Sequence, residues 1–231
     1  MSKIDNTKIS HIFPLTVFKT KLGLKDEERE VLIKEIYIQE KQSKNKKKDK
    51  SWTGDQQGFE FLFLNEKFNQ LFILISNQIK EYAITLGLNS KKIDFYYQRA
   101  WATLTTKDQN IAIHSHTQSH ITFAYYLKKN KDDGKLIFHN EHNPNEIARG
   151  AFSGNLTSAE LVNPNYSNAS KVSFSPELDD IIIFPSKTLH STLSNKSAED
   201  RISISGDISI VAKNSENLEI LLTPINKWKK F

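Results

Sequence analysis

The spacing of apolar residues changes at Ile93, and this change constrains the fold of the 231-residue chain more than any other feature. From Ile93 onward, apolar and polar residues alternate or form short apolar runs between turn-forming residues. Such a pattern is typical of antiparallel sandwiches and jelly rolls. It predicts strands at 93–105, 111–116, 120–128, 134–138, 171–175, 180–184, 188–194 and 201–212. We therefore expect a mainly β (α+β) fold, a double-stranded β-helix of the jelly-roll, cupin-like kind.

Two helices are expected before Ile93. Residues 26–40 and 65–86 carry apolar side chains at helical spacing. Asp26 and Asn65 are suitable caps, and Gly87 is a suitable stop. A short opening strand is expected at 9–18, with a proline that suits a sheet edge. The expected organisation is one domain over 1–231. It consists of the opening strand, the helices and a mobile Lys-rich loop at 1–92, a double-stranded β-helix core at 93–212 and a C-terminal extension at 213–231.

The net charge of +5 is concentrated in one segment. Residues 41–50 contain six lysines and one aspartate, so they carry the whole net charge. Nucleic-acid-binding faces instead spread basic residues along an element and place aromatics among them. We expect a mobile, solvated loop at 41–50, with an electrostatic docking segment as the alternative, and we find no strong signal for nucleic-acid binding.

Composition also limits the location and the chemistry. The chain has no cysteine, which excludes disulfides, thiolate metal sites and a cysteine nucleophile and fits a reducing compartment. The first residues lead into no apolar segment, and no apolar run reaches membrane-spanning length. We expect a cytoplasmic protein, and its high Lys, Asn and Ile content suits a bacterium or a phage-infected host. The oligomeric state stays open, with a homodimer as one option.

Three histidines form the candidate metal site. His114 and His116 lie two apart in a predicted strand, so their side chains share one face about 6–7 Å apart. His190 follows the predicted strand at 180–184. His120 has the same parity as His116 but lies about 13 Å further along a strand, so we expect it near the pocket mouth. Three imidazoles favour a borderline metal such as Fe(II), Zn or Cu.

An arginine follows these histidines in the chain. Arg201 begins a predicted strand that places Arg201, Ser203 and Ser205 on one face. Its planar guanidinium can bind a carboxylate through two parallel hydrogen bonds. A metal site and a carboxylate site are therefore expected inside one barrel.

These motifs, in this order, resemble the Fe(II)- and 2-oxoglutarate-dependent oxygenases, in particular the prolyl-hydroxylase-like group of bacterial and phage proteins. The matching pieces are residues 12–15 (Ile-Phe-Pro-Leu), 114–116 (His-Ser-His), 124–127 (Ala-Tyr-Tyr-Leu), 134–138, 180–186, His190 and 201–205 (Arg-Ile-Ser-Ile-Ser). The resemblance implies an enzyme that uses Fe(II), 2-oxoglutarate and O₂ to hydroxylate a small-molecule or peptide substrate, with release of succinate and CO₂.

The resemblance also implies roles for individual residues. His114 and His190 match iron ligands. Arg201 matches the residue that binds the distal carboxylate of 2-oxoglutarate, with Tyr126 and Ser203 beside it. The sequence departs from the family at His116, because the broad family has an aspartate at this position, in a His-x-Asp motif. A third histidine ligand removes one negative charge and would make the iron more electrophilic and harder to oxidise.

Two other functions remain open at this point. A cupin-like metal enzyme that does not use 2-oxoglutarate would share the sandwich and the His-x-His motif. However, it would lack its usual glutamate ligand at 120 or 121 and would leave Arg201 unexplained. A non-catalytic binding module on the same barrel is the second alternative.

Overall fold

The computed structural model describes residues 11–231 except 45, 48, 141–142, 153–156 and 218–222. The strands are β1 (Phe18–Lys21), β2 (Trp52–Thr53), β3 (Ile93–Thr105), β4 (Ile121–Lys128), β5 (Leu136–His139), β6 (Lys171–Phe174), β7 (Asp180–Pro185), β8 (His190–Thr192) and β9 (Arg201–Ala212). The α-helices are α1 (Asp26–Gln42) and α2 (Asn69–Thr85), and short 3₁₀ turns lie at Gly54–Gln57, Leu62–Leu64, Glu66–Phe68 and Ile225–Lys227.

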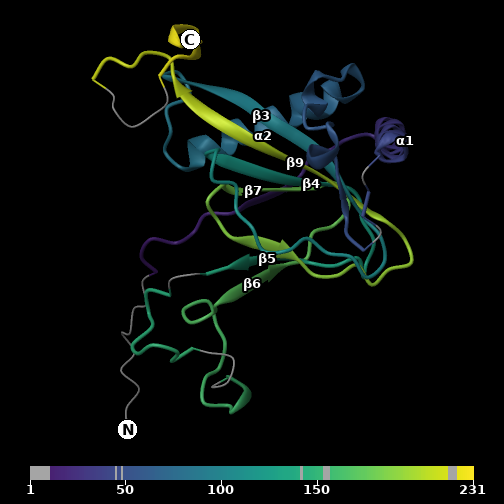
Figure 1. The fold of residues 1–231 in the computed structure, drawn as a ribbon. Coiled ribbons are helices and arrows are strands. Elements are labelled where there is room, and N and C mark those ends of the chain that lie inside the picture. Colours follow the sequence, from purple (N-terminus) through teal and green to yellow (C-terminus); the bar gives the residue numbers. More distant parts are fainter. Residues whose placement is uncertain (1–10, 45, 48, 141–142, 153–156, 218–222) are drawn as a thin grey trace.

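The strands form two antiparallel sheets that lie one over the other (Figure 1). The larger has six strands in the order β1-β7-β4-β9-β3-β2, and the smaller has three in the order β6-β5-β8. The longest pairing joins β3 to β9, from Ile93 opposite Ala212 to Thr105 opposite Arg201. The predicted double-stranded β-helix is confirmed, and β3 and β9 have the predicted bounds.

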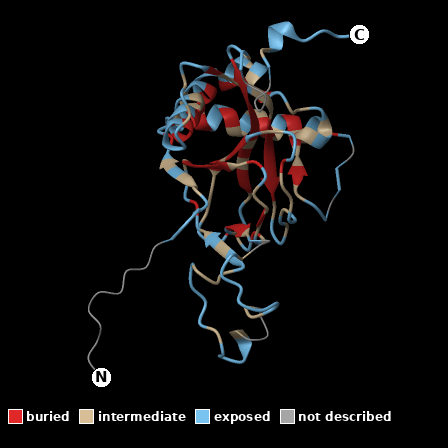
Figure 2. Ribbon diagram, turned by 90° about the vertical axis from the view of Figure 1, so that its left-hand side faces the viewer, coloured by how far each residue is buried: buried red, intermediate tan, exposed pale blue. Residues whose placement is uncertain are grey.

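Both helices cover the outer face of the large sheet (Figures 1 and 2). Every second residue of the central strands, such as Phe123 on β4 and Ile204 on β9, points toward them and is fully buried. The helices add a matching apolar stripe, which consists of Leu32, Ile36, Leu71, Phe72, Ile75, Ile79 and Tyr82. No helix in the described part of the chain is long and apolar enough to cross a bilayer.

The inner face of the large sheet has a different character. A small apolar cluster of Tyr126, Leu136, Phe138, Ile182 and Phe184 joins it to the small sheet at one side. Elsewhere the inward positions of β3, β4 and β9 are mostly polar and line a pocket. The alternation that buries one face therefore places polar side chains on the other, as a period of two requires.

The predicted strand at 111–116 is wrong. His114 exchanges backbone hydrogen bonds with His190 of β8 (3.0 and 2.9 Å), but the N–H of His116 donates to the carbonyl of Ser186 beyond β7 (2.9 Å). The segment therefore changes partner between the two histidines and forms a loop rather than a strand.

The N-terminal predictions need three further corrections. The first strand is Phe18–Lys21 rather than 9–18; residues 9 and 10 lie outside the described part, and Pro14, which has no N–H, follows Phe13 at φ 58°. Lys25, not Asp26, precedes the first helical residue of α1. Asn65 does cap, but it caps the 3₁₀ turn before α2 through the N–H of Lys67. Gly87 follows α2 at φ +84° and ends it as predicted.

Candidate active site

A pocket of about 710 Å³ opens between the two sheets. Inward-facing residues of β3, β4 and β9 form one wall, and His190, Ser191 and Thr192 of β8 form another. Lys46, Lys47 and Lys50, from the lysine-rich segment that the sequence predicted to be a solvated loop, also line it. All six predicted site residues line this pocket, namely His114, His116, Tyr126, His190, Arg201 and Ser203.

The three predicted metal ligands lie together. The ring centroids of His114 and His190 are 4.2 Å apart, and that of His116 lies 5.1 Å from His114 and 5.3 Å from His190. One ring nitrogen from each can be chosen so that all three lie within 4.8 Å of one another. The loop places His114 through its backbone pairing with His190, so the histidines converge without sharing a strand.

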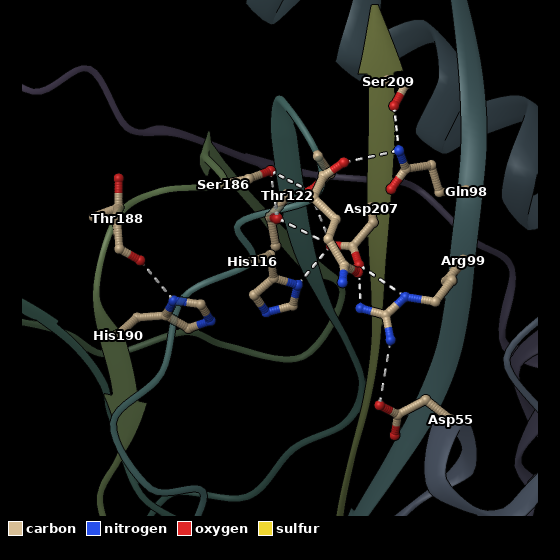
Figure 3. Close-up of polar contacts among 12 residues, drawn as sticks. Asp55, Gln98, Arg99, His116, Thr122, Ser186, Thr188, His190, Asp207 and Ser209 are labelled. Atoms are coloured by element: carbon tan, nitrogen blue, oxygen red, sulfur yellow. Dashed lines mark hydrogen bonds and ion pairs between the residues drawn. The ribbon is translucent and has the colours of Figure 1, made fainter.

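The Nδ1 atom of each ring has an acceptor. His114 Nδ1 lies 2.9 Å from the carbonyl of Ala112. Figure 3 shows the other two contacts, in which His190 Nδ1 lies 2.9 Å from the carbonyl of Thr188 and His116 Nδ1 lies 2.5 Å from Oδ1 of Asp207. A hydrogen on Nδ1 leaves the Nε2 lone pair free for a metal. Among the described residues, His116 Nε2 is buried without a hydrogen-bond partner. The donor set and this buried atom fit a bound Fe(II).

The surroundings keep two of the imidazoles neutral. Burial, together with the nearby His114, lowers the pKa of His190 to about 3. Burial also lowers the pKa of His114. Since metals bind the unprotonated imidazole, neither ring needs to lose a proton at neutral pH before it binds one.

Asp207, which the sequence reasoning missed, holds His116. Its side chain is 1% exposed and accepts from His116 on one oxygen and from Arg99 on the other (2.6 Å; Figure 3). Burial alone would raise the pKa of Asp207, but the hydrogen bonds and charges of His116 and Arg99 outweigh it and lower this pKa. The sequence does contain a signal that Asp207 faces the pocket, because the alternation that aligns Arg201, Ser203 and Ser205 continues to position 207.

Trp101 is a second residue whose place the sequence did not reveal. Its indole stacks on the His116 imidazole, with ring centroids 5.6 Å apart and an interplanar angle of 17°. The guanidinium of Arg99 covers the same indole at 4.9 Å. His120, in contrast, accepts a hydrogen bond from the N–H of Ile210 at Nδ1 (2.8 Å) and is not part of the histidine cluster.

Arg201 is buried in the same pocket with a side chain only 2% exposed. Its guanidinium donates to the carbonyl of Asp133 (2.7 Å) and to the hydroxyls of Thr192 (3.1 Å) and Thr105 (3.3 Å). The carboxylate of Asp133 is instead paired with Lys129. Within the described residues no carboxylate forms an ion pair with Arg201. Burial lowers its pKa, because desolvation disfavours the charge.

Tyr126 and Ser203 stand beside Arg201. They are cross-strand partners of β4 and β9 on the inner face. Tyr126 is buried, and this burial raises its pKa to about 12, so its phenol keeps its proton. Two hydroxyls therefore accompany one cation whose hydrogen-bond partners are all neutral, an arrangement suited to a carboxylate ligand.

Comparison with known proteins agrees with this geometry. Residues 99–207 match the family model described as putative 2OG-Fe(II) oxygenase, where 2OG denotes 2-oxoglutarate. No curated protein matches the sequence.

Solved structures share the fold at low sequence identity. The 2-oxoglutarate-dependent epimerase SnoN of nogalamycin biosynthesis has a TM-score of 0.57 at 13% identity, over 87% of this chain and 82% of that one. A prolyl-4-hydroxylase of Pseudomonas putida has 0.53 at 14%, over 84% and 92%. The viral collagen prolyl hydroxylase of Paramecium bursaria Chlorella virus-1 has 0.51 at 16%, over 83% and 94%. Residues 99–207 therefore resemble the Fe(II)- and 2-oxoglutarate-dependent oxygenases in sequence, and the chain shares the fold of these solved structures.

Proposed function

We propose that the protein is a hydroxylase whose iron is held by His114, His116 and His190 and whose 2-oxoglutarate is held by Arg201. The observation that carries this proposal is the buried charge of Arg201, which has only neutral partners in the described part of the chain. A buried charge is costly unless a counter-charge is present. The distal carboxylate of 2-oxoglutarate supplies that counter-charge in the pocket that contains the three histidines.

The chain's own residues bind and orient the reactants. Nε2 of each histidine faces the metal position, because Nδ1 is engaged by an acceptor. Tyr126 and Ser203 offer hydroxyls to the carboxylate oxygens that Arg201 leaves free. When bound, the iron and 2-oxoglutarate supply the oxidising chemistry, in which O₂ is consumed, one oxygen atom enters the substrate and succinate and CO₂ are released.

The substrate enters, in this proposal, through the mouth of the pocket. The wall there is polar and includes Lys46, Lys47 and Lys50. A small molecule or a peptide segment is the proposed substrate class. The absence of cysteine and the high Lys, Asn and Ile content support a cytoplasmic location in a bacterium or a phage-infected cell.

Anaerobic calorimetry tests the proposal. Fe(II) should bind to the wild type with a stoichiometry of one, and 2-oxoglutarate should bind to the iron-loaded protein. Alanine at position 114 or 190 should abolish stoichiometric iron binding while the far-UV circular dichroism is unchanged. A wild type that binds iron but no 2-oxoglutarate would instead support a cupin-like metal enzyme. That function would leave the buried charge of Arg201 without an anionic ligand.

A further inference from the structure

Asp207 is bound from several sides within the site. Oδ1 accepts from Nδ1 of His116 (2.5 Å) and from the hydroxyls of Ser119 and Thr122 (3.3 Å each). Oδ2 accepts from Nε (3.2 Å) and Nη2 (2.6 Å) of Arg99. The carboxylate therefore has one orientation, with Oδ1 turned toward His116 (Figure 3).

His116 differs from the other two histidines in its Nδ1 partner. His114 and His190 donate to neutral backbone carbonyls, whereas His116 donates to a carboxylate. A carboxylate partner both fixes the Nδ1–H tautomer and makes Nε2 a stronger electron donor than a carbonyl partner does. His116 is also the residue that stands where the broad family has an aspartate ligand.

We infer that Asp207 is a positioning residue that returns to the metal site, through His116, the negative charge that the third histidine removes. The inference rests on the proposed three-histidine metal site. In this arrangement the carboxylate does not bind the metal itself. It accepts the hydrogen bond from Nδ1 of His116, whose Nε2 binds the metal. The metal thereby regains negative charge nearby while its three protein ligands are all imidazoles.

Arg99 does not cancel this charge, because a second carboxylate shares it. Arg99 lies between Oδ2 of Asp207 (2.6 Å) and Oδ2 of Asp55 (3.8 Å). Two carboxylates and one guanidinium leave one net negative charge in the network. Asp207 is the member of the network that contacts His116.

The test exchanges the carboxylate between the two positions. Asp207→Asn keeps an oxygen that can accept from His116 but removes the charge, and it should weaken Fe(II) binding about 10- to 100-fold. His116→Asp in the wild-type background places a second carboxylate beside Asp207, and like charges at one site disfavour each other, so it too should weaken binding. In the double variant His116→Asp/Asp207→Asn one carboxylate remains, and binding should recover to within a few-fold of wild type.

Asp180→Asn is the matched control. Asp180 is buried to 2% exposure and paired with Lys19 and Lys21 away from the histidines. Its loss should reduce the melting temperature and leave Fe(II) affinity unchanged. Affinities are measured by anaerobic calorimetry with Fe(II) and repeated with Co(II), whose absorption spectrum reports the ligand set.

A measurement on the metal-free wild type needs no variant. Long-range ¹H–¹⁵N spectra of the histidine side chains should show His116 with its hydrogen on Nδ1. The inference is overturned by the other tautomer, by an Asp207→Asn variant that binds Fe(II) as the wild type does, or by a double variant whose losses simply add. A wild type that binds no Fe(II) would overturn the proposed function itself, which separates the two failures.

Discussion

Two arginines face the pocket from neighbouring strands, and their surroundings are opposite. Arg99 of β3 is 36% exposed at its side chain and is paired with Asp207 and, more distantly, with Asp55. Arg201 of β9 is 2% exposed, and its partners are one backbone carbonyl and two threonine hydroxyls. The better-buried cation is therefore the one without a carboxylate.

This difference indicates which part of the site is complete without a ligand. At the Arg99 end the chain supplies both signs of charge, so the network can hold His116 in one orientation before anything binds. At the Arg201 end the cation is desolvated and oriented, but none of its hydrogen-bond partners carries a negative charge. Replacing Arg201 should therefore affect ligand binding more than replacing Arg99.

The largest effect is expected at Arg201. Arg201→Ala should weaken 2-oxoglutarate binding by about two to four decades, since losing one partner of a buried charge pair costs about 3–5 kcal/mol. Iron binding should persist, because no histidine partner is removed. Arg201→Lys should recover only part of the 2-oxoglutarate affinity, since lysine lacks the planar guanidinium that forms two parallel hydrogen bonds to a carboxylate. Calorimetry of the iron-loaded proteins measures both.

Arg99→Ala is the comparison variant for this experiment. Its charge is already engaged by Asp207 and Asp55, so 2-oxoglutarate affinity should fall less than about tenfold. Equal losses from the two arginines would show that the contrast between them does not identify the anion site.

Substitution of Gly134 should have the next largest effect, because this glycine lies in the turn next to the guanidinium of Arg201. It has φ +96°, and a Cβ there would lie 2.3 Å from the carbonyl oxygen of Leu193 and 2.9 Å from Nη1 of Arg201. Gly134→Ala should cost about 2–5 kcal/mol of unfolding free energy, as backbone strain and overpacking add. It should also weaken 2-oxoglutarate binding.

Gly87 offers the control for that turn. It has φ +84°, and a Cβ there would meet nothing within 4 Å. Gly87→Ala should cost only the conformational strain, about 1–2 kcal/mol, with no change in ligand affinity. Urea denaturation gives both free energies, and similar values for the two variants would contradict the role assigned to the turn.

The sequence predicted the strands well where alternation alone decides the structure. The strands at 93–105 and 201–212 were predicted to the residue, since their alternation is long and only one bulge, between Tyr97 and Arg99, interrupts it. The segment 111–116 has similar composition but is a loop, because its backbone bonds first to Thr192 and His190 of β8 and then to Ser186. That exchange depends on tertiary contacts that no local pattern contains.

The site was predictable by residue type but not by environment. The histidines and Arg201 could be selected from their types and spacing. The neutral surroundings of Arg201 could not, since Thr105, Asp133 and Thr192 come from three distant segments. Asp207 lay within reach of the alternation argument, but its role depends on Arg99 and His116, which approach it only in the folded chain.

A third prediction concerns stability without ligands. Arg201→Met removes a buried, uncompensated charge, so the ligand-free protein should lose less than about 1 kcal/mol of unfolding free energy or become more stable. Arg29→Met should instead cost about 3 kcal/mol, because it leaves the carboxylate of Asp179, now 3.2 Å from Arg29, without its cation. Chemical denaturation of the iron-free proteins measures both. A large loss in Arg201→Met would mean that its neutral partners stabilise the charge on their own.

The smallest effect separates two adjacent tyrosines on opposite faces of β4. Tyr126 lines the pocket with Arg201, whereas the hydroxyl of Tyr125 donates to Asp179 (2.9 Å) and accepts from Arg29 (3.1 Å) on the other face. Tyr126→Phe keeps the ring packed against Leu136 and Phe138 and removes one hydroxyl from the carboxylate site. Since a hydrogen bond contributes about 0.5–1.5 kcal/mol, 2-oxoglutarate affinity should fall up to about tenfold with little change in melting temperature.

Tyr125→Phe should show the reverse pattern. It removes a partner from the buried Arg29–Asp179 pair, so the melting temperature should fall by a few degrees while 2-oxoglutarate affinity stays within twofold of wild type. Thermal unfolding and calorimetry on the same two preparations give the four values. If Tyr125→Phe weakens 2-oxoglutarate binding as much as Tyr126→Phe does, the carboxylate is not bound on the inner face of β4, and the assignment of Arg201 as its partner fails with it.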